Sequence, residues 1–366
     1  MKRKSSSVLE EEAQTSAVKT KKKDKKSQRT ENNNGLENTD DPWARLRLWV
    51  DNDLSTGQYN VDYVSRLCAQ CRDVPHNKHV RFTEFDLTKV LCCYEASTSV
   101  NDQLLFRVLY LLESIPNIDM LRIAPVLWSQ MARTRYKDHV SRLSVNVGVR
   151  TTSVDVLQSI DAQSLWYTLV HLQGDANMDV MSTLNPPNAD IYDHRFLLPL
   201  LCDITDSGRE LDCQLFVTQN CLSLLFACLA LHDTHARAMA YLGVHNFMAQ
   251  LKCLSCTTAS FPHKTQLLYL CTLLKNSVEK DNQRLSTITA HFFARVAKLS
   301  LHPEDTKMYT LMNQYLLLKP ETDLACVPEF RLMFQASDIE RDWVCQLLVD
   351  ALKQPIDYHM AVKEYV

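Results

Sequence analysis

Two cysteines and two histidines early in the chain have the residue types and spacing of a candidate metal site. Cys68 and Cys71 form a C-x2-C pair, and His76 and His79 follow it. Thiolates and imidazoles in pairs are the usual ligands of zinc, but the second pair of a zinc finger ordinarily lies about a dozen residues further along. The cysteines also end an apolar helical pattern over 61–71, which favours packing. We keep a zinc-assisted enzyme or a zinc-stabilised module as an alternative hypothesis.

The remaining candidate groups for catalysis lack the partners that their chemistry requires. His232 and His235 could lie on adjacent helical turns, but the glutamate of an H-E-x-x-H site is absent. Cys253 and Cys256 have no second ligand pair nearby. The six glycines are scattered, which excludes the glycine-rich turns of a P-loop or a dinucleotide-binding fingerprint. We therefore expect a protein that is not an enzyme, with no resident metal, no cofactor and no small-molecule substrate.

Basic residues gather in two clusters at the N-terminus, separated by a short linker. The first cluster is Lys2, Arg3 and Lys4, and the second is Lys19, Lys21, Lys22, Lys23, Lys25 and Lys26. This arrangement resembles a bipartite nuclear import signal, whose extended lysines would bind the acidic grooves of a nuclear import carrier. The same lysines could neutralise RNA phosphates, and because no aromatic residue interleaves with them, such contacts would be salt-sensitive and independent of sequence. A tail that only keeps the protein soluble is the simpler alternative.

The net charge of −3 conceals a segregation of charge along the chain. Residues 1–29 contain 10 Lys and Arg against 4 acidic residues, a charge of +6, whereas the rest contains 30 against 39, a charge of −9. The N-terminus carries no apolar targeting segment, and the longest apolar run, from Cys221 to Leu231, is about half the ~20 residues of a membrane span. Several of the 13 cysteines lie inside apolar helical patterns, which indicates a reduced, intracellular compartment. We expect a nuclear protein with no membrane segment.

The hydrophobic periodicity after Trp43 is helical, and the scarcity of glycine, 6 in 366 residues, also favours helices. Residues 1–41 contain hardly any large apolar side chain, so we expect them to be disordered. Asn101 and Ser286 are the expected N-caps of two helices, and Ser337 or Asp338 of a third. The amphipathic patterns predict helices over 61–71, 82–96, 102–114, 152–172, 209–231, 234–255, 263–279, 286–299, 304–318 and 338–352.

We expect an all-α fold in which antiparallel helix pairs stack as a degenerate armadillo or HEAT-like array, although no fixed repeat signature is present. Asparagine, aspartate and proline residues at 175–190 predict a long loop. The predicted organisation is a Lys-rich tail (1–41), an N-terminal helical subdomain (42–174), this loop, and a C-terminal helical domain (191–366).

Several segments between residues 150 and 352 resemble, in order, the C-terminal domain of the nucleolar pre-ribosomal-associated protein family. They are Ile191–Leu201, Lys264–Leu270, Asn282–Ser286, Val327–Phe334 and Arg341–Val344. In the first of them, His194 stands where the family pattern has proline. Their prominent residues, which we expect to be structural anchors at helix starts and in the core, are Tyr192, Asp193, Arg195, Phe196, Pro199, Pro328, Phe330, Phe334 and Trp343. Such residues specify packing, so the resemblance identifies a domain rather than an active site.

The resemblance implies a scaffold of the nucleolus that acts in early assembly of the large (60S) ribosomal subunit and in maturation of its RNA. It implies pre-ribosomal particle proteins, ribosomal RNA, small nucleolar RNPs and an RNA helicase as partners. Family members are far longer than this chain, with an extensive helical region ahead of the domain. A different class of function stays open, namely an armadillo-like protein-interaction adaptor unrelated to ribosomes.

Overall fold

The computed structural model describes residues 40–57, 59–116, 118, 126–141, 151–254, 261–304, 306–318, 338–355, 357–359 and 362. Within these ranges the chain is helical and contains no strand, and an isolated antiparallel bridge joins Ser97 to Tyr192. The predicted all-α array is confirmed. The basic clusters of the tail, from Lys2 to Lys26, lie outside the described residues.

The N-terminal half contains helices of two to four turns. They are α2 (Pro42–Asn52), the 3-10 turn η2 (Leu54–Thr56), α3 (Val61–Asp73), α4 (Glu84–Cys93), α5 (Val100–Glu113), α6 (Ser129–Ser141), α7 (Ser153–Ser159) and α8 (Ala162–His171). The prediction that Asn101 caps α5 was wrong by two residues. Ser99 has extended backbone, and its hydroxyl accepts a hydrogen bond from the Asp102 amide at 3.2 Å, whereas Asn101 already lies in the first helical turn.

The C-terminal half begins after a long irregular segment. Its helices are α9 (His194–Thr205), α10 (Cys213–Thr218), α11 (Cys221–Cys228), α12 (Thr234–Cys253), α13 (Lys264–Ser277), α14 (Thr287–Leu299), α15 (Thr306–Leu318) and α17 (Asp338–Ala351). Ser286 caps α14 as predicted, since its hydroxyl accepts from the Thr289 amide at 3.2 Å.

Two of the predicted helices are each divided into two shorter ones. The helix predicted over 152–172 breaks because Asp161 adopts extended backbone and caps α8, accepting from the Ser164 amide at 2.7 Å. The helix predicted over 209–231 breaks at Asn220, which takes a left-handed φ of 61° between α10 and α11. Apolar periodicity continued through both breaks, so the pattern alone did not reveal them.

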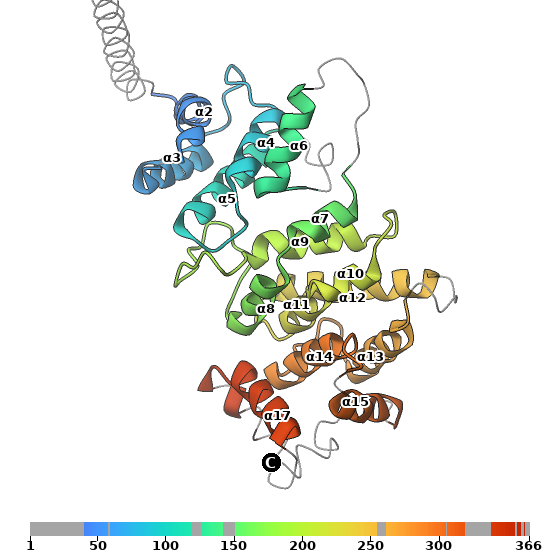
Figure 1. Cartoon of the computed structure of the whole chain (residues 1–366). Helices are drawn as coiled ribbons and strands as arrows, with labels where there is room; N and C mark the ends of the chain where they lie inside the picture. Colours follow the sequence, from blue (N-terminus) through green and yellow to red (C-terminus); the bar gives the residue numbers. More distant parts are fainter. Residues whose placement is uncertain are drawn as a thin grey trace, which may run out of the picture.

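One hydrophobic core runs through the stacked helices from Trp43 to Ala351. Helices pack mainly on close neighbours in the chain, such as α3 on α5, α11 on α12 and α14, and α14 on α17. Figure 1 shows the resulting elongated array, with the blue helices α2 and α3 at one end and α15 and α17 at the other. Nearest-neighbour packing of this kind is the property that defines a helical array. No helix in the described ranges combines the length and apolarity needed to cross a bilayer.

The most buried helix lies in the middle of the array. Every residue of α11 is buried, and it is covered by α8, α12 and α14. Gly243 of α12 permits a close approach to α11, because an added Cβ would lie 2.9 Å from Cδ1 of Leu225. The apolar run that begins at Cys221 is therefore the central core element of the array.

Residues 175–190 form no helix, yet they are tied to helices from both halves of the chain. The Gln103 amide group of α5 bonds both main-chain groups of Leu184, at 2.8 and 2.9 Å. Asp233, the N-cap of α12, accepts from the Met178 amide at 3.0 Å. The segment is thus packed chain with specific partners.

Candidate functional site

The segment from Tyr192 to Phe196 joins the two halves of the array. The Asp193 amide donates to the Ala96 carbonyl at 2.7 Å, so this segment meets the link between α4 and α5. The Tyr192 amide donates to the Thr168 hydroxyl of α8 at 2.8 Å. The family-like residues therefore lie where α5, α8 and α9 come together.

A buried ion pair forms the centre of this junction. The side chains of Asp193 and Arg195 are 0% exposed, and Nη2 of Arg195 lies 2.6 Å from the carboxylate. The Nε atom donates to both Asp193 oxygens at 2.9 and 3.1 Å. The remaining Nη1 donates to the carbonyls of Asp179 and Ser182, both at 2.9 Å. Each guanidinium nitrogen has a partner, which is what burial of a charge requires.

Aromatic rings pack around the ion pair. Phe196 meets Tyr94 and Trp128 edge-on, with ring centroids 5.0 and 5.4 Å apart, and the Arg195 guanidinium lies 5.6 Å from the centroid of Phe106. Tyr94 is fully buried and its hydroxyl has no hydrogen-bond partner. Burial and the nearby charges of Asp193 and Asp102 raise the pKa of Tyr94 well above its usual value. The described contacts at the junction are therefore those of a packing site.

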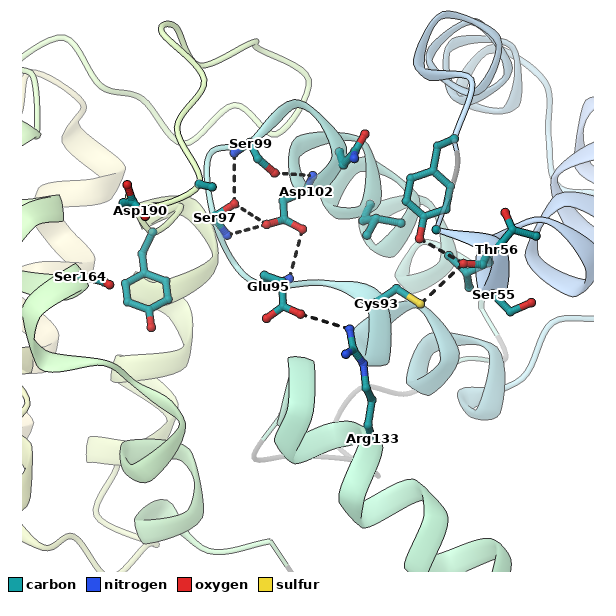
Figure 2. Close-up of a pocket in the computed structure, with 17 residues that line it drawn as sticks. Ser55, Thr56, Cys93, Glu95, Ser97, Ser99, Asp102, Arg133, Ser164 and Asp190 are labelled. Atoms are coloured by element: carbon teal, nitrogen blue, oxygen red, sulfur yellow. Dashed lines mark hydrogen bonds and ion pairs between the residues drawn. The ribbon is translucent and has the colours of Figure 1, made fainter.

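An open cavity of about 690 Å³ adjoins the junction and is shown in Figure 2. Its walls come from η2, from the link between α4 and α5, from Arg133 of α6, and from the segment that carries Asp190 and Tyr192. The lining contains three carboxylates, those of Glu95, Asp102 and Asp190, and one guanidinium, so it is rich in hydrogen-bond acceptors.

Two of these carboxylates are held in place by neighbouring groups. Arg133 Nη2 lies 3.1 Å from Glu95. Asp102 accepts from the amides of Ser97 and Glu95 at 3.0 and 3.1 Å, and also from the Ser97 hydroxyl. Burial nevertheless raises the pKa of Asp102, because desolvation of the charged form outweighs these hydrogen bonds.

The described residues that line the cavity do not form an activated nucleophile. A serine nucleophile is normally activated by a base such as histidine, but the residues that line this cavity include no histidine or lysine, and the Ser97 hydroxyl donates to a carboxylate. Burial raises the pKa of the Cys93 thiol, which disfavours the reactive thiolate. Sequence reasoning missed this site, although Ser99 and Asp102 have the S-x-x-D spacing of a capping box.

Of the four residues considered for zinc, Cys68, Cys71 and His76 are used in packing, and His79 is exposed. Cys68 and Cys71 are both 1% exposed, and burial raises the pKa of each thiol to about 12. The His76 ring packs edge-on against Trp43 with centroids 4.9 Å apart. Across the described ranges, no three His, Cys, Asp or Glu side chains converge as metal ligands would.

The other family-like residues divide between core, surface and the parts not described. Trp343 is half-buried, with its ring 6.2 Å from that of the fully buried Phe292. Pro199 lies exposed inside α9. The remaining three, Pro328, Phe330 and Phe334, lie outside the described residues.

Comparison with known proteins finds a family model that matches the C-terminal part of the chain. Residues 222–366 match the family model of nucleolar pre-ribosomal-associated protein 1. The mouse (Mus musculus) protein of that name is 25% identical over 323 residues, which is 84% of this chain and 14% of the mouse protein. The human (Homo sapiens) protein is 25% identical over 318 residues, 83% of this chain and 13% of its own length.

The chain thus spans about one seventh of the length of these curated relatives. No solved structure matches it significantly. The resemblance expected from the ordered segments is confirmed.

Proposed function

We propose, on the premise that residues 222–366 form a domain of the nucleolar pre-ribosomal-associated protein 1 family, that this chain is a nucleolar scaffold in early assembly of the 60S ribosomal subunit. The observation that carries the proposal is this family match, which covers the stacked helices from α11 to α17. The names of the mouse and human relatives support association with pre-ribosomal particles. Maturation of large-subunit RNA is the step in which we place it.

The array would act by holding partner proteins in fixed relative positions. Helical arrays offer long surfaces whose shape follows from the packing of successive helices. The cavity beside Tyr192 supplies one docking position, since its carboxylates and hydroxyls would accept hydrogen bonds from a donor-rich, cationic segment of a partner. In this role the chain would catalyse no reaction itself, and catalysis would be carried out by partners such as an RNA helicase.

The basic tail would serve transport and non-specific RNA contact. Lysines in two clusters fit a nuclear import carrier, and after import the same charges would neutralise phosphates of ribosomal RNA or small nucleolar RNPs. The body of the chain, with a charge of −9 after residue 29, would be left for protein contacts.

The test is to express the tagged full chain in cells and to sequence the RNA that crosslinks to it. We expect nucleolar signal and enrichment of large-subunit precursor RNA over small-subunit precursor RNA. A matched tail-neutral variant carries glutamine at Lys2, Arg3, Lys4, Lys19, Lys21, Lys22, Lys23, Lys25 and Lys26. It should lose nuclear accumulation while keeping its fold. A purely cytosolic full chain that recovers no pre-ribosomal RNA would instead support the adaptor hypothesis.

A further inference from the structure

A face rich in cations lies where α8, α14 and α17 meet. Arg295 and Lys298 are three residues apart on α14 and therefore project from the same side of that helix. Both contact Trp166 of α8: Nζ of Lys298 lies 4.2 Å from the ring centroid, and Cζ of Arg295 lies 5.6 Å from it. We call these three residues the Trp166 face.

The positive charge of this face is incompletely balanced within the protein. Arg295 is paired with Asp350 of α17, but its Nε atom is shielded from solvent and has no hydrogen-bond partner. In the described part of the chain, Lys298 forms no ion pair. Burial and the charge of Arg295 lower the pKa of Lys298, as expected for an ammonium group beside another cation.

The other charged groups described near the Trp166 face do not cancel its excess positive charge. Lys353, which follows α17, adds a third cation, and Asp350 and Asp357 are the carboxylates that act on it. His291, one turn before Arg295, is buried and has a pKa lowered to about 3 by burial and by the charges of Lys353 and Arg295, so it is neutral at physiological pH. Among the described residues, Arg295, Lys298 and Lys353 are thus three cations beside two carboxylates.

A comparison with Lys89 shows that a lysine over an aromatic ring does not have to lack a carboxylate partner. Lys89 also lies over an aromatic ring, with Nζ 5.1 Å from the centroid of Phe85. That ammonium group is neutralised by Asp51 at 3.0 Å and Asp86 at 3.3 Å. Lys298 contacts an aromatic ring but, among the described residues, no carboxylate. Its charge is therefore available to an external anion.

The chemistry of the face favours RNA over an acidic peptide. Single-stranded nucleic acid is bound where cations for the phosphates lie beside aromatic rings for the bases. Next to Trp166 in α8, but projecting from a different side of the helix, is Tyr167, whose ring is 40% exposed and packs against His171. An acidic peptide would need the cations but would gain less from two aromatic side chains.

We propose that the Trp166 face binds the phosphate backbone of single-stranded RNA, with Lys298 contacting phosphate, the ion-paired Arg295 adding positive charge behind it, and an aromatic side chain of α8 contacting a base. The choice of RNA as the physiological ligand rests on the proposed function in pre-ribosomal particles. The site places RNA on the folded body, in a region that begins 140 residues beyond Lys26, the last lysine of the basic clusters.

The test uses the full-length tail-neutral variant, so that the tail does not mask binding by the body. Fluorescence anisotropy with a labelled single-stranded oligouridine of about 12 nucleotides measures the dissociation constant at several salt concentrations. Lys298→Met should weaken binding about 3- to 10-fold at low salt and reduce the magnitude of the salt slope by about 0.7, the value for one lost phosphate contact with a single strand. The control is Lys275→Met, at an exposed lysine in the last turn of α13, which should change neither quantity.

Three outcomes would overturn the proposal. They are absence of binding by the tail-neutral variant, equal losses for Lys298→Met and Lys275→Met, and displacement of the RNA by polyglutamate as effectively as by unlabelled oligouridine. The last would identify an acidic peptide as the ligand. Circular dichroism melting of each variant excludes unfolding as the cause of a loss. The proposed function would survive any of these outcomes if the unmodified chain still recovered pre-ribosomal RNA in cells.

Discussion

Two arginines lie at the same distance from an aromatic ring, and each is ion-paired with an aspartate, but their guanidinium groups differ in how completely they are hydrogen-bonded. Cζ of Arg195 is 5.6 Å from the centroid of Phe106, and Cζ of Arg295 is 5.6 Å from that of Trp166. At the junction, every guanidinium nitrogen of Arg195 has a partner from the chain. At the Trp166 face, Nε of Arg295 has none. A fully bonded guanidinium such as that of Arg195 holds the fold, whereas the Lys298 ammonium beside Arg295 has no carboxylate partner among the described residues and is available to a ligand.

The largest expected effect on stability is that of a substitution at the junction. Arg195→Met should lower the free energy of unfolding by about 3–5 kcal/mol, because it leaves the Asp193 carboxylate buried without its cation. Urea denaturation followed by circular dichroism measures the loss. The matched control is Arg209→Met, whose partner Asp203 is 35% exposed, and it should cost about 1 kcal/mol or less. Equal losses for the two variants would show that the buried pair has no special structural role.

The next largest effect is the loss of stability at low pH that is expected from the buried His291 of α14. Because the folded-state pKa of His291 is lowered to about 3, its contribution to stability is fully present above the unfolded pKa near 6.5 and is lost as the pH falls toward 3. At pH 5 this loss amounts to about 2 kcal/mol.

The measurement is the free energy of unfolding at pH 7.5 and pH 5 for the wild type and for His291→Leu. The variant should lose about 2 kcal/mol less than the wild type between these values, since leucine takes up no proton in either state. His194, also buried with a lowered pKa, contributes in both proteins and so cancels from the difference. An identical pH dependence in both proteins would contradict the burial of a neutral His291.

A smaller effect of opposite sign is expected at Tyr94. Its hydroxyl is buried without a partner, so Tyr94→Phe removes an unsatisfied polar group and keeps the ring contacts with Phe196 and Phe106. The free energy of unfolding should stay unchanged or rise by up to about 1 kcal/mol. Thermal unfolding of the variant beside the wild type checks this. A loss of more than about 1 kcal/mol would mean that the hydroxyl has a partner, such as a buried water.

The smallest effect on stability should come from the Trp166 face. Lys298→Met removes a cation–π contact worth about 0.5–1 kcal/mol at partly exposed sites, but it also removes the cost of a half-buried ammonium beside Arg295. The net change should lie within about 1 kcal/mol in urea denaturation. A loss comparable to that of Arg195→Met would make Lys298 structural, and its availability to a ligand would no longer follow.

The helix ends show where sequence reasoning succeeded and where it stopped. The cap at Ser286 was readable because a serine stands directly before an apolar pattern. The breaks at Asp161 and Asn220 were not, since the apolar spacing runs through them and only the packing of α8 and α11 requires separate helices. The candidate zinc residues had suitable types, but burial of Cys68 decided their role.

The candidate sites show the same division. Tyr192, Asp193 and Arg195 were identified as anchors from their order in the chain, although their pairing and complete burial were not. The Trp166 face could not be foreseen, because Trp166 and Lys298 are more than 130 positions apart and only the stacking of α8, α14 and α17 brings them together.

By itself, the sequence determined the helical class, the absence of glycine-rich nucleotide motifs, the segregation of charge and the family resemblance. Each of these depends on composition, local periodicity or ordered short segments, all of which a linear chain displays directly. The tertiary structure alone decided which charges are neutralised and which are left over. The reason is physical: whether a lysine or an arginine is balanced depends on the carboxylates and solvent within a few ångströms, and folding brings those together from distant parts of the chain.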